Sequence, residues 1–132
     1  MGSHCLQLHV LSETFAICRL PNDELMPGWA VAGRFYSITR TDDELSIVCP
    51  ETNVPQSVTC ERGWRCMKVD GPMDFSLTGV LSSLAGPLAD AKVSIFALST
   101  YDTDYLLVRA ADLGDATAVL RRNGHEVRAE GT

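Results

Sequence analysis

The feature that most constrains the fold of this 132-residue chain is a pair of short apolar runs in its second half. Val93–Leu98 and Tyr105–Val108 have the length and the β-branched and aromatic residues of buried strands. The polar segment Ser99-Thr-Tyr-Asp-Thr-Asp104 joins them. We therefore expect two strands of one sheet. An Asn-Gly or Asp-Gly pair would make a tight turn. We therefore expect this longer segment to avoid a tight turn and to do more than reverse the chain.

The residues before this pair predict a strand and a helix. Trp64–Asp70 alternates as a strand does, and Gly71-Pro72 then interrupts it. Asp74 follows as the expected N-cap, because its carboxylate can accept from free backbone N–H groups. Pro87 is expected to kink or shorten the helix, since proline has no N–H to donate. The apolar residues at helical spacing are Leu77, Val80, Leu81, Leu84 and Leu88.

The residues after the pair predict a second helix and a last strand. Asp112 is expected to cap the helix, and Asn123-Gly124 is a strong stop signal. A short strand over His125–Arg128 ends the pattern. The order from Trp64 onward is β-α-β-β-α-β, which is typical of a ferredoxin-like fold.

The first half is a weaker version of the same pattern. The expected elements are strands at Thr14–Leu20, Phe35–Arg40 and Leu45–Cys49, about a turn of helix within 21–32, and mostly loop over 50–62. We expect an α+β chain of two related modules, residues 13–62 and 63–132, the first degenerate, with helices on one face of antiparallel sheets. Residues 1–12 are interpreted as a tag remnant at 1–4 and an N-terminal strand.

Charge and cysteine usage limit the partners. The net charge is −6 and the basic residues are scattered, with Arg121-Arg122 the only adjacent pair, so nucleic acid and anionic membranes are poor candidates. No apolar run approaches the roughly 20 residues that span a bilayer. The five cysteines include no Cys-x-x-Cys. We interpret them as small hydrophobic side chains, rather than as redox groups, in a cytoplasmic protein.

Catalytic signatures are lacking. The three histidines have no ligands at metal-binding spacing, and no phosphate-binding, dinucleotide-binding or Gly-x-Ser-x-Gly motif occurs. We therefore expect no enzyme activity, no metal and no cofactor. An enzyme that uses the acidic loop with a divalent cation is kept as a remote alternative.

The segments FAICRLP, FYSITRTDDELSIVCPE and DFSLTGVLSSLAGPLADAKVSIFALSTYDTDYLLV resemble the small stand-alone tandem ACT-domain proteins of bacteria. Those proteins are related to the paired ACT domains of aspartate kinase and of the eukaryotic cytosolic arginine sensor. The resemblance covers about residues 13–129. It implies two βαββαβ modules in one unit, paired again into a homodimer, with small ligands bound where modules meet.

The resemblance also implies a ligand site. It lies between the start of the first helix of one module and backbone near the second strand of a neighbouring module. Asp104 and the Thr100-Tyr101 pair match the family most cleanly, whereas Thr103 stands where the arginine sensor has an aromatic residue. The residues carried over are Asp74, Thr78, Gly79, Val80, Thr100, Tyr101, Asp102, Thr103 and Asp104.

The chemistry of these residues suits an amino acid, which carries an ammonium and a carboxylate group. A helix start supplies N–H donors for the carboxylate, and a glycine such as Gly79 within the helix permits close approach. If strand geometry extends to Asp102, its side chain shares a face with that of Asp104 and attracts a cation. The alternative is structural: the aspartates solvate a loop and cap a strand, and Gly79 serves helix–sheet packing.

Two hypotheses for function follow. The first is a non-enzymatic, cytoplasmic, homodimeric module that senses a free amino acid and allosterically changes its contacts with an unidentified protein target. The second is a structural or protein-interaction module without a ligand. Which amino acid binds is not given by the sequence.

Overall fold

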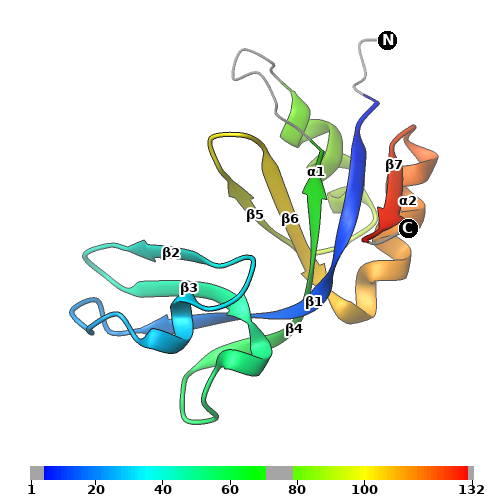
Figure 1. Cartoon of the computed structure of the whole chain (residues 1–132). Coiled ribbons are helices and arrows are strands. Elements are labelled where there is room, and N and C mark those ends of the chain that lie inside the picture. Colours follow the sequence, from blue (N-terminus) through cyan, green and yellow to red (C-terminus); the bar gives the residue numbers. More distant parts are fainter. Residues whose placement is uncertain (1–4, 71–78, 131–132) are drawn as a thin grey trace. The chain divides into compact units, whose positions relative to one another are not determined.

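The computed structural model describes residues 5–70 and 79–130, leaving 1–4, 71–78 and 131–132 outside its described part (Figure 1). The chain forms two compact units. Residues 1–12 and 65–132 make the first, which we call the helical unit, and residues 13–64 make the second, which we call the strand unit. The strands β1 (Gln7–Leu20) and β4 (Cys60–Val69) contribute residues to both.

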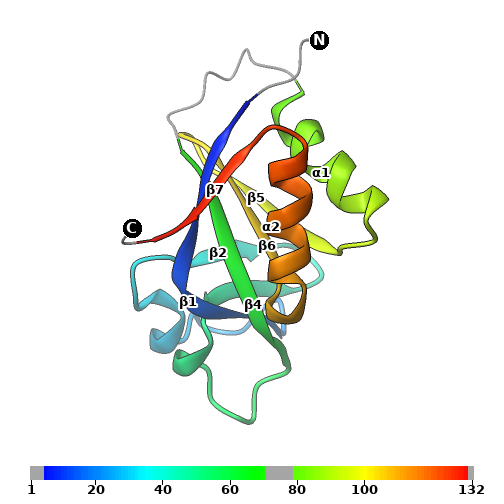
Figure 2. The same ribbon diagram turned by 90° about the vertical axis from the view of Figure 1, so that its right-hand side faces the viewer.

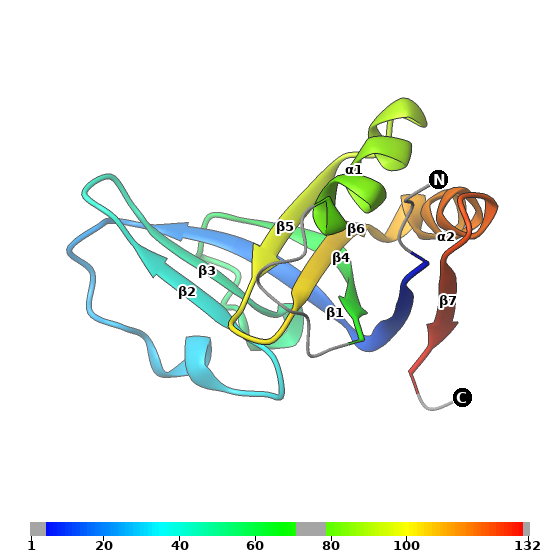
Figure 3. The ribbon, with the colours of Figure 1, turned by 90° about the horizontal axis from the view of Figure 1, so that it is seen from above.

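The helical unit has the expected alternation of strands and helices. Within it the strand order is β7-β1-β4-β6-β5, and both helices cover one face of the sheet (Figures 2 and 3). Besides parts of β1 and β4, its elements are α1 (Val80–Asp90), β5 (Ile95–Ser99), β6 (Asp104–Arg109), the 3-10 turn η3 (Ala110–Asp112), α2 (Leu113–Arg122) and β7 (Glu126–Ala129).

The two apolar runs that constrained the fold are neighbouring strands of this sheet. β5 and β6 pair antiparallel from Ile95–Val108 to Ser99–Asp104, which confirms the expectation. Alternate side chains of β6, such as Leu106 and Val108, pack with Leu84 and Leu120 of the two helices in one apolar core. The fold is α+β and ferredoxin-like, as the sequence predicted.

The N-terminal strand is part of this core. Residues Gln7–Val10 of β1 lie between β7 and β4 and pair parallel with β7, from Gln7–Glu126 to Val10–Ala129. Leu8 is fully buried. The sequence predicted a strand here, and the structure adds its neighbours.

The ends of the helices differ in detail from the sequence-based expectation. Gly79 is not inside α1 but is its N-cap, in the left-handed region at φ 80°. Asp74 and Leu77, expected in the same helix, lie outside the described residues. Asp112 does occupy the N-cap of α2, but its side chain makes no capping hydrogen bond. Pro87 lies inside α1, which ends three residues later at Asp90.

The strand unit contains short 3-10 turns where the sequence predicted little helix. Residues 15–20 of β1 pair antiparallel with β3, which pairs antiparallel with β2. The elements completing it are η1 (Gly28–Val31), β2 (Ser37–Arg40), β3 (Leu45–Pro50) and η2 (Glu51–Asn53).

Three cysteines belong to the apolar core of the strand unit. Cys18 and Cys49 are buried in it, Cys60 packs against it, and all three are free thiols. The hydrogen bond with the Cys49 side chain is the main cause that raises the pKa of the Cys18 thiol, and burial raises it further. The same hydrogen bond lowers the pKa of the Cys49 thiol. Burial raises the pKa of Cys60.

Candidate functional site

The residues that the sequence singled out gather at one end of the helical unit. The turn between β5 and β6 lies at the end of the sheet where β4 finishes and α1 begins (Figure 1). Of the nine candidates, Asp74 and Thr78 fall outside the described residues. The other seven belong to this turn or to the start of α1.

Thr100 closes the turn. Its backbone N–H donates to the carbonyl oxygen of Thr103 at 2.9 Å, its hydroxyl donates to the same oxygen at 3.1 Å, and that hydroxyl accepts from the Thr103 N–H at 3.3 Å. The expectation that this segment avoids a tight turn is therefore wrong, because the Thr100 side chain supplies the bonds that hold it closed. Tyr101 and Asp102 lie at the tip, and Tyr101 is 83% exposed.

Thr103 fastens the turn to the end of β4. Its side chain is buried, and its hydroxyl donates to the carbonyl oxygen of Val69 at 2.7 Å. Val69 is the last residue of β4. The hydroxyl is thus engaged inside the protein, with a partner that no sequence pattern indicated.

Asp104 begins β6 and is fixed by its cross-strand neighbour. The Ser99 hydroxyl donates to Oδ1 of Asp104 at 2.6 Å, and the two residues face each other in the register. By strand alternation Asp104 shares the face of Leu106 and Val108, which the helices cover. The position of Ser99 directly opposite Asp104 in the strand pair explains this contact.

Asp102 does not share a strand face with Asp104. The condition for a shared face was strand geometry at Asp102, and β6 begins only at Asp104. Burial raises the pKa of the Tyr105 phenol, and the nearby Cys66 and Asp102 raise it further. Tyr105 and Asp104 are consecutive strand residues with side chains on opposite faces. The condition for a single acidic spot made of both aspartates is therefore not met.

The start of α1 offers backbone rather than side chains. Val80 is 7% exposed and belongs to the core cluster, so its side chain is not available to a ligand. Its N–H lies in the first turn, where helix N–H groups have no intrahelical acceptor. Gly79 accepts at its carbonyl oxygen from the Ser83 N–H at 2.8 Å. Its φ of 80° is itself a sufficient reason for glycine there.

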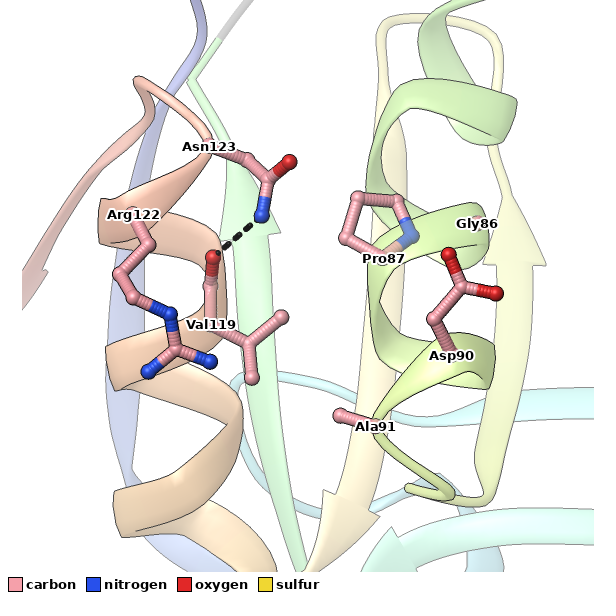
Figure 4. Close-up of a pocket in the computed structure, with 7 residues that line it drawn as sticks. All are labelled: Gly86, Pro87, Asp90, Ala91, Val119, Arg122 and Asn123. Atoms are coloured by element: carbon pink, nitrogen blue, oxygen red, sulfur yellow. Dashed lines mark hydrogen bonds between the residues drawn. The ribbon is translucent and has the colours of Figure 1, made fainter.

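A groove of about 400 Å³ lies elsewhere in the helical unit, between the last turns of α1 and α2 (Figure 4). Pro87 faces Asn123 across it, and the Asn123 amide donates to the carbonyl oxygen of Val119 at 2.8 Å. The Asp90 carboxylate points away from α2, and the Arg122 side chain runs along α2 rather than toward Asp90 (Figure 4). The two charged groups do not converge on one ligand position.

The part of the chain that the structure describes lacks two further kinds of feature. No group of three or more His, Cys, Asp or Glu side chains there is arranged to hold a metal ion. None of the described helices has both the length and the apolar character needed to cross a membrane.

Comparison with known families gives two matches along the chain. A model of the ACT domain matches residues 59–122, and a model of an N-terminal domain matches residues 13–57. The bovine cytosolic arginine sensor for mTORC1 subunit 1 is 37% identical over 100 residues, which are 67% of this chain. The chain spans 30% of the length of that sensor and 61% of the length of a shorter human relative.

Solved structures share the whole fold. A protein from Agobacterium tumefaciens superposes with a TM-score of 0.92 at 43% identity, with 98% of this chain and 96% of that chain covered. Aspartate kinase from Clostridium acetobutylicum gives a TM-score of 0.68 at 12% identity, over 94% of this chain and 36% of the kinase. The likeness to the kinase shows the fold alone. The domain model, together with the sensor relative, establishes that residues 59–122 of this chain belong to the ACT-domain family.

Proposed function

We propose that this protein is a non-enzymatic regulatory module that binds a free amino acid at the β5–β6 turn. In this proposal it is cytoplasmic and homodimeric, and ligand binding changes its contacts with a protein target. The Thr78-Gly79-Val80 segment of the neighbouring copy then closes the site. The nine residues expected from the sequence remain the proposed ligand-binding set, with Asp104 as its central member.

The observation that carries the proposal is the placement of Asp104. Asp104 is the first residue of β6, which starts at the end of the sheet where α1 begins (Figure 1). By strand alternation its side chain shares the face that the helices cover. Ser99 holds one carboxylate oxygen at 2.6 Å, which orients the group and leaves the second oxygen for a ligand's ammonium. Backbone N–H groups at a helix start suit the ligand's carboxylate.

The comparisons support the same class of ligand. A relative named as a cytosolic arginine sensor is 37% identical over the matched residues. Amino-acid sensing is the simplest function for this chain that agrees both with the name of that relative and with the Asp104 carboxylate at the turn.

The test is calorimetric titration of the wild-type protein with each of the twenty amino acids, followed by the Asp104→Asn variant. Asparagine keeps an oxygen that can accept from Ser99 but loses the charge. Loss of a charge-assisted hydrogen bond should weaken binding about ten- to a hundredfold. The melting temperature without ligand should move little, because the Ser99 contact is kept.

The matched control is Asp90→Asn. Asp90 is exposed at the opposite end of α1, so this variant changes the net charge equally and should bind as the wild type does. If a ligand is found and Asp104→Asn binds it with wild-type affinity, the turn is structural and the proposed site is wrong.

The alternative is an interaction module without a ligand. The internal hydrogen bonds of Thr100, Thr103 and Ser99 favour it, since they give the polar turn residues a structural purpose. Absence of heat with every amino acid, combined with recovery of a specific protein complex, would establish this alternative.

A further inference from the structure

A second cavity, of about 330 Å³, lies in the helical unit away from the β5–β6 turn. It is bounded by one face of α2 and by residues of β1, β4 and β7. No Asp or Glu of the described chain lines it. Its polar lining includes Arg65, Thr117 and Arg121, and its apolar lining includes Val10, Leu113 and Val127.

The sequence brings these residues together by simple periodicity. Leu113, Thr117 and Arg121 are four residues apart and form one stripe along α2. Arg65 alternates with Met67 and Val69, which face the helices from β4. Arg65 therefore extends from the sheet toward the stripe on α2.

Arg65 carries a hydrogen-bond donor that nothing in the described chain satisfies. Its Nη2 donates to the carbonyl oxygen of Leu11 at 3.0 Å, but its Nε is buried without an acceptor. Arginine stays charged in proteins, and its five N–H groups are all donors. A buried donor without a partner is destabilising, so an acceptor on a molecule bound in the cavity would be favourable.

The neighbours of Arg65 add further hydrogen-bond donors to the cavity. Nη2 of Arg121 donates to the carbonyl oxygen of Val127 at 2.6 Å, which fixes that guanidinium beside the cavity. The Thr117 hydroxyl has no hydrogen-bond partner among the described residues. Arg128 also lines the cavity, but its side chain pairs with Asp70 at 3.4 Å, so its charge is already matched.

We propose that this cavity, which we call the Arg65 pocket, binds a small oxyanion with about two negative charges, a phosphate group or a dicarboxylate. Guanidinium groups match both in shape and charge. Arg65 and Arg121 hold the anion, Thr117 donates a further hydrogen bond, and Val10, Leu113 and Val127 supply the apolar part of the wall. The whole chain has a net charge of −6. The described lining of this cavity, in contrast, has Arg65 and Arg121 and no carboxylate, so its local charge is positive and suits an anion.

The test uses two probes, inorganic phosphate and succinate, each titrated calorimetrically into the full chain at constant ionic strength. Saturable binding of one probe at one site per chain is expected. Phosphate binding without succinate binding assigns the pocket to phosphate-bearing ligands, and the converse assigns it to dicarboxylates. Arg121→Gln should weaken the binding about tenfold or more, since a charge-assisted hydrogen bond is lost.

Arg122→Gln is the matched control. It removes the same charge from the next residue of α2, and Arg122 does not line the pocket. Its binding should stay within about twofold of the wild type, because an exposed charge outside the site contributes little. Thr117→Val, which leaves the arginines and the local shape intact, should weaken binding several-fold.

Three outcomes would overturn the proposal. The first is that neither probe binds, so that only water fills the pocket. The second is that Arg121→Gln and Arg122→Gln lose affinity equally, which indicates general attraction by charge. The third is that Thr117→Val and Arg121→Gln both bind as the wild type does. None of these outcomes bears on the amino-acid site, because no residue is shared between the two.

Discussion

At the scale of single residues, the turn between β5 and β6 uses its side chains to satisfy its own backbone. Thr100 bonds across the turn, Ser99 bonds Asp104, and Thr103 reaches the end of β4. Tyr101 remains exposed at the tip. A ligand site built on such a turn is already rigid before the ligand arrives, which lowers the ordering cost of binding.

Thr103→Val tests how much the bond to β4 contributes. Valine has nearly the same shape but no hydroxyl, so the buried carbonyl oxygen of Val69 loses its donor at 2.7 Å. The free energy of unfolding should fall by about 1–3 kcal/mol, measured by urea denaturation. Thr39→Val, at an exposed position of β2, should change it by no more than about 0.5 kcal/mol. Equal effects of the two variants would contradict a special role for Thr103.

The sequence located the turn but not the partners of its side chains. A polar segment between two apolar runs indicates that the chain turns there, but it does not indicate which groups the polar side chains contact. The contact of Thr103 with Val69 spans 34 residues, and no local pattern encodes it. The condition that Asp102 and Asp104 share a strand face was not met for a related reason: β6 begins two residues after Asp102, and a sequence pattern does not determine the first residue of a strand.

At the scale of elements, the apolar runs predicted β5 and β6 because buried strands need β-branched and aromatic residues. The position of β1 between β7 and β4 was beyond the sequence. A parallel partner more than a hundred residues away leaves no local signal, and the pair Leu8–Val127 is of this kind. Gly79 was misplaced within α1 because glycine suits a helix start in the left-handed region as well as close packing.

Leu8→Ala tests whether the N-terminal strand is integral to the helical unit. Leu8 is fully buried among residues of the sheet and both helices. Truncating such a side chain costs about 2–5 kcal/mol, since it loses apolar burial and leaves a cavity. Chemical denaturation should show that loss, whereas Gln7→Ala, at an exposed neighbour in the same strand, should have little effect. A mild effect at Leu8 would mean that β1 is peripheral.

At the scale of the whole molecule, the described sheet of the helical unit ends in β7 on one side and in β5 on the other, and β5 offers an edge for pairing. β5 lies at the end of the described strand order, so one row of its backbone N–H and C=O groups has no neighbouring strand among the described residues. Phe96 and Leu98 are half-buried, and Ala97 is exposed. An edge of this kind invites pairing with another chain, and a second copy of the same chain is the partner we expect.

The homodimer prediction can be checked by light scattering at micromolar concentration, which should return twice the 14.4 kDa of one chain. Ala97→Lys places a charge on the edge strand and should shift the mass toward the monomer, because lysine at an edge opposes pairing. Ala118→Lys makes the same change at an exposed position of α2 and should leave the dimer intact if the edge is the interface. Dissociation by Ala118→Lys alone would assign the interface to the helix face instead. A wild-type mass of one chain would refute the dimer itself, and with it the closure of the amino-acid site by a neighbouring copy.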